Sequence, residues 1–256
     1  AAIKPYITYA LGIICTLGTL NHLPHWKTET ALYEQALKQD ASSYVVLNSL
    51  GVEYTRQGES AKALACFFKA MRINPNNYKA FYNCGLLYLK LQNTTSAIER
   101  FNRSIALYPY TKAFTARGSA YLQRGDWPKA IADFQQALQQ DSTNYKAWLL
   151  LADCSQQFNL LPQAISQYNK AIKNYPYEAE SYFKRGLCYG KQNQFQNALL
   201  DFNAALRLNP KNGAYFYWIA LTKIAMGLDP CADITQAMAL NYENAKALHL
   251  KYCINM

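Results

Sequence analysis

The sequence predicts an all-α fold, a solenoid of repeated helix–turn–helix pairs, and three observations lead to that prediction. Small residues, large apolar residues and prolines each recur about every 34 residues. The glycines of one register are Gly51, Gly85, Gly118 and Gly186, with successive gaps of 34, 33 and 68 residues, the last being two periods. Self-similarity at this period is typical of stacked helix pairs that bury their apolar faces against their neighbours. No segment shows sustained strand alternation.

The first helix of each unit is predicted from apolar residues at helical spacing. Leu47, Leu50 and Tyr54 are three and four residues apart, so they share one helix face. Glycine or alanine in the register of Gly51 removes bulk where two helices should cross closely, and large aromatic residues fill the remaining space. First helices are expected at 44–57, 78–91, 111–124, 145–158, 179–192 and 213–226.

The second helix of each unit follows from the same reasoning. Ala63, Phe67 and Ala70 share one face. Prolines mark unit ends because they cannot continue a helix, whereas near a helix start the missing N–H costs little. Unit ends fall at Pro75, Pro109, Pro176 and Pro210, and second helices start near Pro128, Pro162 and Pro230. Second helices are expected at 60–73, 94–107, 127–140, 161–174, 195–208 and 230–240.

One copy of the recurring pattern, which begins near Tyr44, contains in order Leu50, Gly51, Tyr54, Ala63, Phe67, Ala70 and Pro75. This order resembles the tetratricopeptide repeat, W-x2-L-G-x2-Y followed by A-x3-F, A and P. The resemblance covers roughly 200 of the 256 residues. It implies an all-α, right-handed superhelical solenoid of about six repeats, with a long concave surface that works by holding another molecule.

The ends of the chain depart from the repeat, which predicts four regions. Trp26 to Asp40 reads as one amphipathic helix, the second half of a diverged repeat, and Asn244 to Cys253 reads as a final helix. Terminal units of solenoids are atypical because one face meets solvent. The predicted regions are a hydrophobic helix at 1–24, a half repeat at 25–41, six repeats at 42–241 and a C-terminal capping helix at 242–256.

The hydrophobic start has three readings. Residues Tyr6 to Leu20 are mostly apolar, and no Lys, Arg, Asp or Glu occurs between Lys4 and Lys27. A membrane-spanning helix needs about 20 predominantly apolar residues, so the segment is either a cap of the solenoid or a truncated membrane helix. A signal peptide is the third reading, although no convincing cleavage site follows. Membrane attachment through residues 1–20 would make the protein membrane-associated with a soluble repeat domain; the alternative is a cytoplasmic protein.

The junction after this segment carries a second resemblance. Trp26, Glu29, Leu32, Ala36, Leu37 and Gly51 follow a hydrophobic run and lead into repeats. This order is similar to the junction between the last membrane helix and the repeats in transmembrane, tetratricopeptide-repeat O-mannosyltransferase-like proteins. The resemblance implies an alternative function, the C-terminal regulatory or substrate-presenting region of a multi-spanning membrane glycosyltransferase. The catalytic part of such an enzyme is not among these residues.

Composition narrows the kinds of partner and disfavours catalysis. The formal net charge of +10 favours acidic partners, of which nucleic acid is the least expected because no zinc-finger spacing, RNA-binding motif or dense Lys/Arg run is present. The seven cysteines include no C-x2-C pair, so buried free thiols are expected. His22 and His25 flank Pro24 and lack further ligands nearby, so no metal site is expected. With no catalytic motif or recurrent carboxylate pair, we expect neither an enzyme nor a cofactor.

Two inward positions of the first helices supply the candidate binding residues. Lys79, Lys112 and Lys146 occupy one place in three successive repeats, and Asn83, Lys184 and Trp218 share another. By the family resemblance, first helices line the concave face, so these residues would form a basic trough with aromatic patches. The alternative is that the lysines are a solvated helix face. The sequence thus predicts a scaffold that binds an acidic or extended partner segment through Lys79, Asn83, Lys112, Lys146, Lys184 and Trp218.

Overall fold

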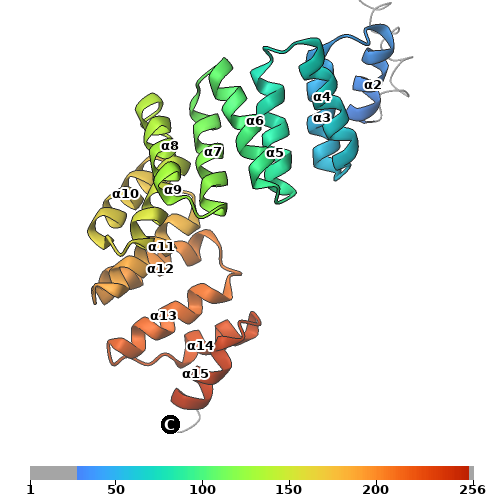
Figure 1. The fold of residues 1–256 in the computed structure, drawn as a ribbon. Helices are drawn as coiled ribbons and strands as arrows, with labels where there is room; N and C mark the ends of the chain where they lie inside the picture. Colours follow the sequence, from blue (N-terminus) through green and yellow to red (C-terminus); the bar gives the residue numbers. More distant parts are fainter. Residues whose placement is uncertain (1–27, 254–256) are drawn as a thin grey trace, which may run out of the picture. The chain divides into compact units, whose positions relative to one another are not determined.

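The computed structural model describes residues 28–253, and within them every regular element is an α-helix. The helices alternate between first and second members of six pairs (Figure 1). First helices are α3 (Tyr44–Gln57), α5 (Tyr78–Lys90), α7 (Thr111–Gln123), α9 (Tyr145–Gln157), α11 (Ala179–Lys191) and α13 (Gly213–Ala225). Second helices are α4 (Ser60–Ile73), α6 (Thr94–Leu107), α8 (Trp127–Gln140), α10 (Leu161–Asn174), α12 (Phe195–Leu208) and α14 (Cys231–Ala239). Helix α2 (Glu29–Gln39) precedes the pairs, and α15 (Asn244–Tyr252) follows them. The predicted fold class is confirmed.

Helix boundaries agree with the repeat pattern to within one residue at either end of each paired helix. The pair that departs most from the repeat is the sixth, in which α14 has nine residues where α12 has 14. Its chain is shorter before Ile234, and Pro230 stands at the N-cap. Each first helix is followed by a residue with a left-handed backbone, which ends a helix tightly. These residues are Gly58, Gln92, Gly125, Asn159, Asn193 and Gly227.

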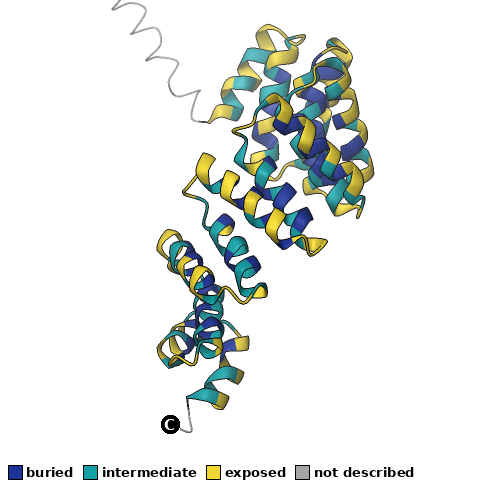
Figure 2. Cartoon of the chain, turned by 90° about the vertical axis from the view of Figure 1, so that its left-hand side faces the viewer, coloured by how far each residue is buried: buried dark blue, intermediate teal, exposed yellow. Residues whose placement is uncertain are grey.

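The contacts divide the described chain into two compact units, here called unit 1, up to Pro109, and unit 2, from Tyr110 onward. Each unit has apolar cores between its paired helices, and Figure 2 shows the buried residues on the faces that the helices turn toward one another. The division falls between two repeats, after Pro109, and not at the region boundaries predicted from the repeat pattern. Those predicted domain boundaries remain predictions.

The glycine register marks the closest approach of paired helices. A Cβ atom on Gly51 would lie 2.6 Å from the Phe67 ring, and one on Gly118 would lie 2.5 Å from the Phe134 ring. Gly85 faces Phe101 and Gly186 faces Phe202 in the same way. Because these rings are almost fully buried, any side chain here would have to displace a core aromatic. The close helix crossing predicted from the sequence is therefore confirmed.

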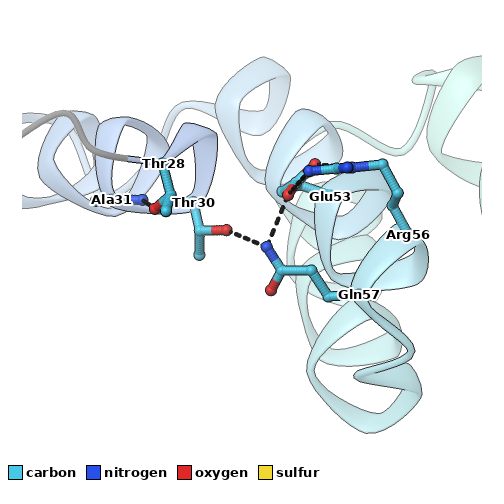
Figure 3. A network of polar contacts seen from close by, with 6 residues as sticks. All are labelled: Thr28, Thr30, Ala31, Glu53, Arg56 and Gln57. Atoms are coloured by element: carbon cyan, nitrogen blue, oxygen red, sulfur yellow. Dashed lines mark hydrogen bonds and ion pairs between the residues drawn. The ribbon is translucent and has the colours of Figure 1, made fainter.

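Helix α2 docks on α3 through a polar network that surrounds a buried carboxylate (Figure 3). Glu53 is only 4% exposed. Its carboxylate accepts hydrogen bonds from Arg56 at 2.7 and 2.8 Å and from Gln57 at 2.7 Å, and Gln57 also donates to Thr30 on α2 at 2.6 Å. The hydrogen bonds from Arg56 are the main reason that the pKa of Glu53 lies below its ordinary value. The Tyr54 hydroxyl adds a bond to Glu34 of α2 at 2.6 Å.

Among residues 28–253, the cysteines comprise three buried thiols, the partly buried thiol of Cys66, and one disulfide. Burial raises the pKa of Cys84 and Cys188 to about 11 and that of Cys154 to about 12, as expected for inert core thiols. The expectation of free thiols is wrong for Cys231 and Cys253, which form a disulfide between α14 and α15. Their separation of 22 residues does not reveal that the start of α14 and the end of α15 meet.

The predicted hydrophobic helix at 1–24, with the membrane attachment proposed for residues 1–20, lies outside the described residues. Among the helices from α2 to α15, none is both long enough and apolar enough to cross a membrane.

Candidate partner-binding surfaces

The first helices carry both groups of candidate residues, which we describe separately for each unit. In unit 1, Lys79 is an exposed residue in the first turn of α5, and Asn83 lies one turn later. The Asn83 amide donates to the Asn48 side-chain oxygen on α3 at 3.0 Å. Lys79 and Asn48 both line a hollow of about 290 Å³, together with Tyr44, Val45, Asn74, Asn76, Asn77 and Tyr78. The hollow is rich in amides and lacks a carboxylate, so it suits polar or anionic groups.

In unit 2, Lys112 and Lys146 repeat the placement of Lys79. Each is the second residue of its helix, α7 and α9, and each is exposed. Among the described residues neither forms an ion pair. A lysine in the first turn of a helix opposes the helix dipole, so these cations do not serve helix stability. They leave positive charge beside the N-terminal ends of two first helices.

Lys184, predicted at the second inward position, is not a free cation. Its ammonium group lies 2.7 Å from an Asp153 oxygen and 2.8 Å from a Glu180 oxygen. Burial acts to lower the pKa of Lys184, but the charges and hydrogen bonds of Asp153 and Glu180 together outweigh it, so the pKa is raised. Asp153 also accepts a hydrogen bond at 2.7 Å from the hydroxyl of the fully buried Tyr168. The charge of Lys184 is therefore balanced inside unit 2.

Trp218 lies at the wall of an apolar hollow of about 460 Å³ in unit 2. Its ring packs against Phe202, with 6.4 Å between ring centroids, and edge-on against Tyr217. The rest of the wall comes from Gln156, Leu187, Gly190, Lys191, Phe195, Phe202, Leu221 and Thr222. The sequence analysis identified Trp218 but missed this hollow. The available signal was Gly190, which stands where the other first helices carry a side chain.

Two further cations of unit 2 are neutralised by pairs that the sequence analysis missed. Arg117 donates two hydrogen bonds to Asp133, at 2.7 and 2.8 Å. Arg185 makes the equivalent paired bonds to Asp201, and both carboxylates are buried. The hydrogen bonds to Asp133 raise the pKa of Arg117 above its ordinary value. Partners 16 residues apart carry no local signal, because neither helix spacing nor strand spacing relates them.

The six candidates thus fall into groups. Lys79 and Asn83 come together in unit 1, and Lys112 and Lys146 present exposed charge in unit 2. The predicted row of three lysines spans both units and stays a prediction. No cluster of three or more His, Cys, Asp or Glu side chains that could hold a metal occurs in residues 28–253.

Comparison with known families identifies the repeat. Models described as tetratricopeptide repeat match residues 79–109, 115–179 and 179–212, and a model described as TPR repeat matches residues 51–92. The chain is 26% identical over 194 residues to DnaJ homolog subfamily C member 3 of Mus musculus, covering 70% of this chain and 38% of that protein. It is 24% identical over 219 residues to BBSome complex member BBS4 of Bos taurus, covering 85% of this chain and 42% of that protein. The chain therefore spans only about two fifths of the length of these relatives.

Solved structures share the fold at low sequence identity. The Cut9–Hcn1 hetero-tetramer structure of APC/C matches with a TM-score of 0.73 and 16% identity, covering 91% of this chain and 47% of that chain. PilW, a type IV pilus biogenesis factor, matches with a TM-score of 0.72 and 19% identity, covering 81% of this chain and 98% of that chain. YrrB, described as a TPR protein with an unusual peptide-binding site, matches with a TM-score of 0.57 and 17% identity, covering 72% and 96%. At these identities the likeness concerns the fold alone.

Proposed function

Because the chain belongs to the tetratricopeptide-repeat family, we propose that it is a non-catalytic scaffold whose first helices bind an acidic or extended segment of a partner protein. Interaction with other proteins is the general role of such repeats. The acidic character of the partner, and the residues that contact it, are the specific parts of the proposal. The binding residues would be Lys79 and Asn83 in unit 1, and Lys112 and Lys146 in unit 2.

One observation supports the acidic partner above all. Lys79, Lys112 and Lys146 share one register position, are exposed and form no ion pair among the described residues. The cations of unit 2 that lie near carboxylates, such as Arg117 and Arg185, are already paired. A carboxylate of a partner would gain from each lysine and from the helix N-terminus beside it. Such charges would mainly raise the association rate and select the partner.

The other two candidates play different parts in this proposal. Lys184 would hold α11 against α9 through Asp153 rather than contact a partner. Trp218 would supply apolar contact area. The alternative role, as the repeat region of a membrane glycosyltransferase, stays a prediction because residues 1–27, from which much of it was inferred, lie outside the described chain.

The proposal is tested by selecting binders from a random peptide library with three proteins: the wild type, Lys79→Glu/Lys112→Glu/Lys146→Glu, and the control Lys69→Glu/Lys173→Glu/Lys211→Glu. The control changes the net charge equally at exposed residues outside the first helices. We expect the wild type and the control to enrich Asp and Glu, and the first variant to lose that enrichment. Equal enrichment by all three proteins would refute the proposed site.

A further inference from the structure

We infer that the apolar hollow of unit 2 is a socket for one large apolar side chain of the partner segment, with an acidic residue of the same segment at Lys191. The inference rests on the proposed function and adds a specificity determinant to it. Four helices build the socket: Gln156 on α9, Lys191 on α11, Phe195 on α12 and Trp218 on α13 are wall residues.

The socket exists because one position of α11 lacks a side chain. Gly190 belongs to a register that holds Thr55, Leu89, Leu122, Gln156 and Ile224 in the other first helices. A Cβ atom built on Gly190 would meet nothing within 4 Å, whereas one on Gly186, a turn earlier, would lie 2.7 Å from Phe202. Glycine within a helix is destabilising relative to alanine, and close packing does not require it at position 190. Gly190 therefore leaves open a space that any larger residue would occupy.

The lining suits an apolar side chain of considerable size. Leu187, Phe202, Trp218 and Leu221 provide an aliphatic and aromatic wall. The volume, about 460 Å³, falls within the range of roughly 300–1,000 Å³ found for ligand sites. Aromatic residues in such desolvated pockets often dominate the binding energy of an interface. A leucine, methionine or aromatic side chain would bury apolar area here that an alanine could not.

The positive charge of Lys191 at the rim of the socket favours an acidic residue in the partner segment, beside the apolar one. Lys191 is exposed, and it has no ion pair within residues 28–253. No carboxylate lines the socket. The nearby carboxylate Asp153 is held by Lys184 and Tyr168. A partner cation would therefore meet an unpaired lysine, whereas a partner carboxylate would be attracted to it.

The substitution Gly190→Leu tests the inference because it fills the socket from within. The matched control is Gln123→Leu, which adds the same side chain at an exposed position of α7, away from the socket. The probes are two acetylated synthetic peptides in which glutamates flank one leucine or one alanine. Binding is measured by titration, and occupancy by the indole N–H resonance of Trp218, assigned by comparison with Trp218→Phe.

For the wild type and Gln123→Leu, we expect the leucine peptide to bind about tenfold or more tightly than the alanine peptide and to shift the Trp218 resonance. For Gly190→Leu we expect both the preference and the shift to disappear, while the thermal midpoint stays equal to or above that of the wild type. Lys191→Gln should weaken both peptides. A leucine preference that survives in Gly190→Leu would overturn the inference, as would equal binding of the two peptides by the wild type.

The experiment distinguishes this inference from the proposed function. If Gly190→Leu has no effect but Lys112→Glu/Lys146→Glu weakens both peptides, the socket is refuted and the scaffold proposal stands. If the lysine substitutions have no effect but Gly190→Leu abolishes the leucine preference, the socket stands. The proposal that the exposed lysines bind an acidic partner segment then fails.

Discussion

Units 1 and 2 both contain helix pairs in which a glycine of the first helix contacts a phenylalanine of the second. The residues that directly precede this glycine and this phenylalanine differ between the units. In unit 1 the two residues that precede Gly85 and Phe101 are Cys84 and Arg100. The Nε of Arg100 is buried without a hydrogen-bond partner in the described chain, and the guanidinium lies 5.6 Å from the Phe68 ring centroid. In unit 2 the equivalent positions of two helix pairs, α7–α8 and α11–α12, hold the ion pairs of Arg117 with Asp133 and of Arg185 with Asp201.

The difference shows that the repeat motif and the charge pattern are independent. The motif residues determine how two helices cross, so the helix pairs of both units have the same backbone arrangement. The residues beside the motif determine which charged side chains form ion pairs within the protein and which remain available to bind a partner. The repeat alone therefore identifies a scaffold, and only the neighbouring positions point to what it binds.

Breaking an ion pair of unit 2 should have the largest effect. Arg185→Met leaves Asp201 buried without its partner and should reduce the free energy of unfolding by about 3 kcal/mol, measured by urea denaturation. The double variant Arg185→Met/Asp201→Leu should recover most of that loss. In unit 1, Arg100→Met should be neutral or stabilising because it removes a buried N–H group that has no hydrogen-bond partner in the described chain. If Arg100→Met costs as much as Arg185→Met, the contrast between the units is wrong.

The close helix crossing should be equally strict in both units. Gly85→Ala in unit 1 and Gly186→Ala in unit 2 each place a Cβ within 2.7 Å of a core phenylalanine, and each should cost about 2 kcal/mol in unfolding free energy. Gly190→Ala, on the same helix as Gly186, should instead gain about 0.5–1 kcal/mol. Chemical denaturation of the three variants measures these values. A stabilising effect of Gly186→Ala would contradict the packing described here.

Paired and exposed lysines should respond differently to removal. Lys184→Met in unit 2 leaves Asp153 without its ion-pair partner and should destabilise the protein by about 1.5 kcal/mol. Lys79→Met in unit 1 should change stability by no more than about 0.5 kcal/mol. Thermal and urea unfolding compare the two. If the two substitutions have equal effects, Lys184 is as free as Lys79 and belongs with the partner-binding lysines.

The smallest effects concern two carboxylates with opposite pKa shifts. In unit 1 the hydrogen bonds from Arg56 lower the pKa of Glu53, so its stabilising contribution is present above the unfolded pKa and is lost as pH falls through the folded pKa. In unit 2 burial, opposed by Lys184, raises the pKa of Asp153, so folding becomes more favourable at this site as pH falls. Carboxyl-carbon NMR titration should place Glu53 below and Asp153 above the ordinary range. Shifts of the same sign would contradict the assigned environments.

Most of the fold was predictable from the sequence because the same residue pattern recurs in each repeat, so that the helices assigned in one repeat support those assigned in the others. The recurrence of Gly51 and Phe67 fixes the helix crossing, and each copy strengthens the assignment of the rest. The site was less predictable, because the pairing of Lys184 with Asp153 joins different positions of neighbouring repeats. The Cys231–Cys253 disulfide joins the atypical last helices, where no second copy exists for comparison. The sequence shows which lysines share a register position, but only the folded structure shows whether each lysine forms an ion pair.

The central claim, that exposed lysines of the first helices bind an acidic partner segment, is tested most directly by the salt dependence of peptide binding. The dissociation constant of one selected acidic peptide would be measured over a range of salt concentrations for the wild type, for Lys79→Glu/Lys112→Glu/Lys146→Glu and for the charge-matched control Lys69→Glu/Lys173→Glu/Lys211→Glu. We predict that affinity falls steeply with salt for the wild type and the control, and that the first variant binds weakly at every concentration. Identical salt curves for all three proteins would contradict the claim.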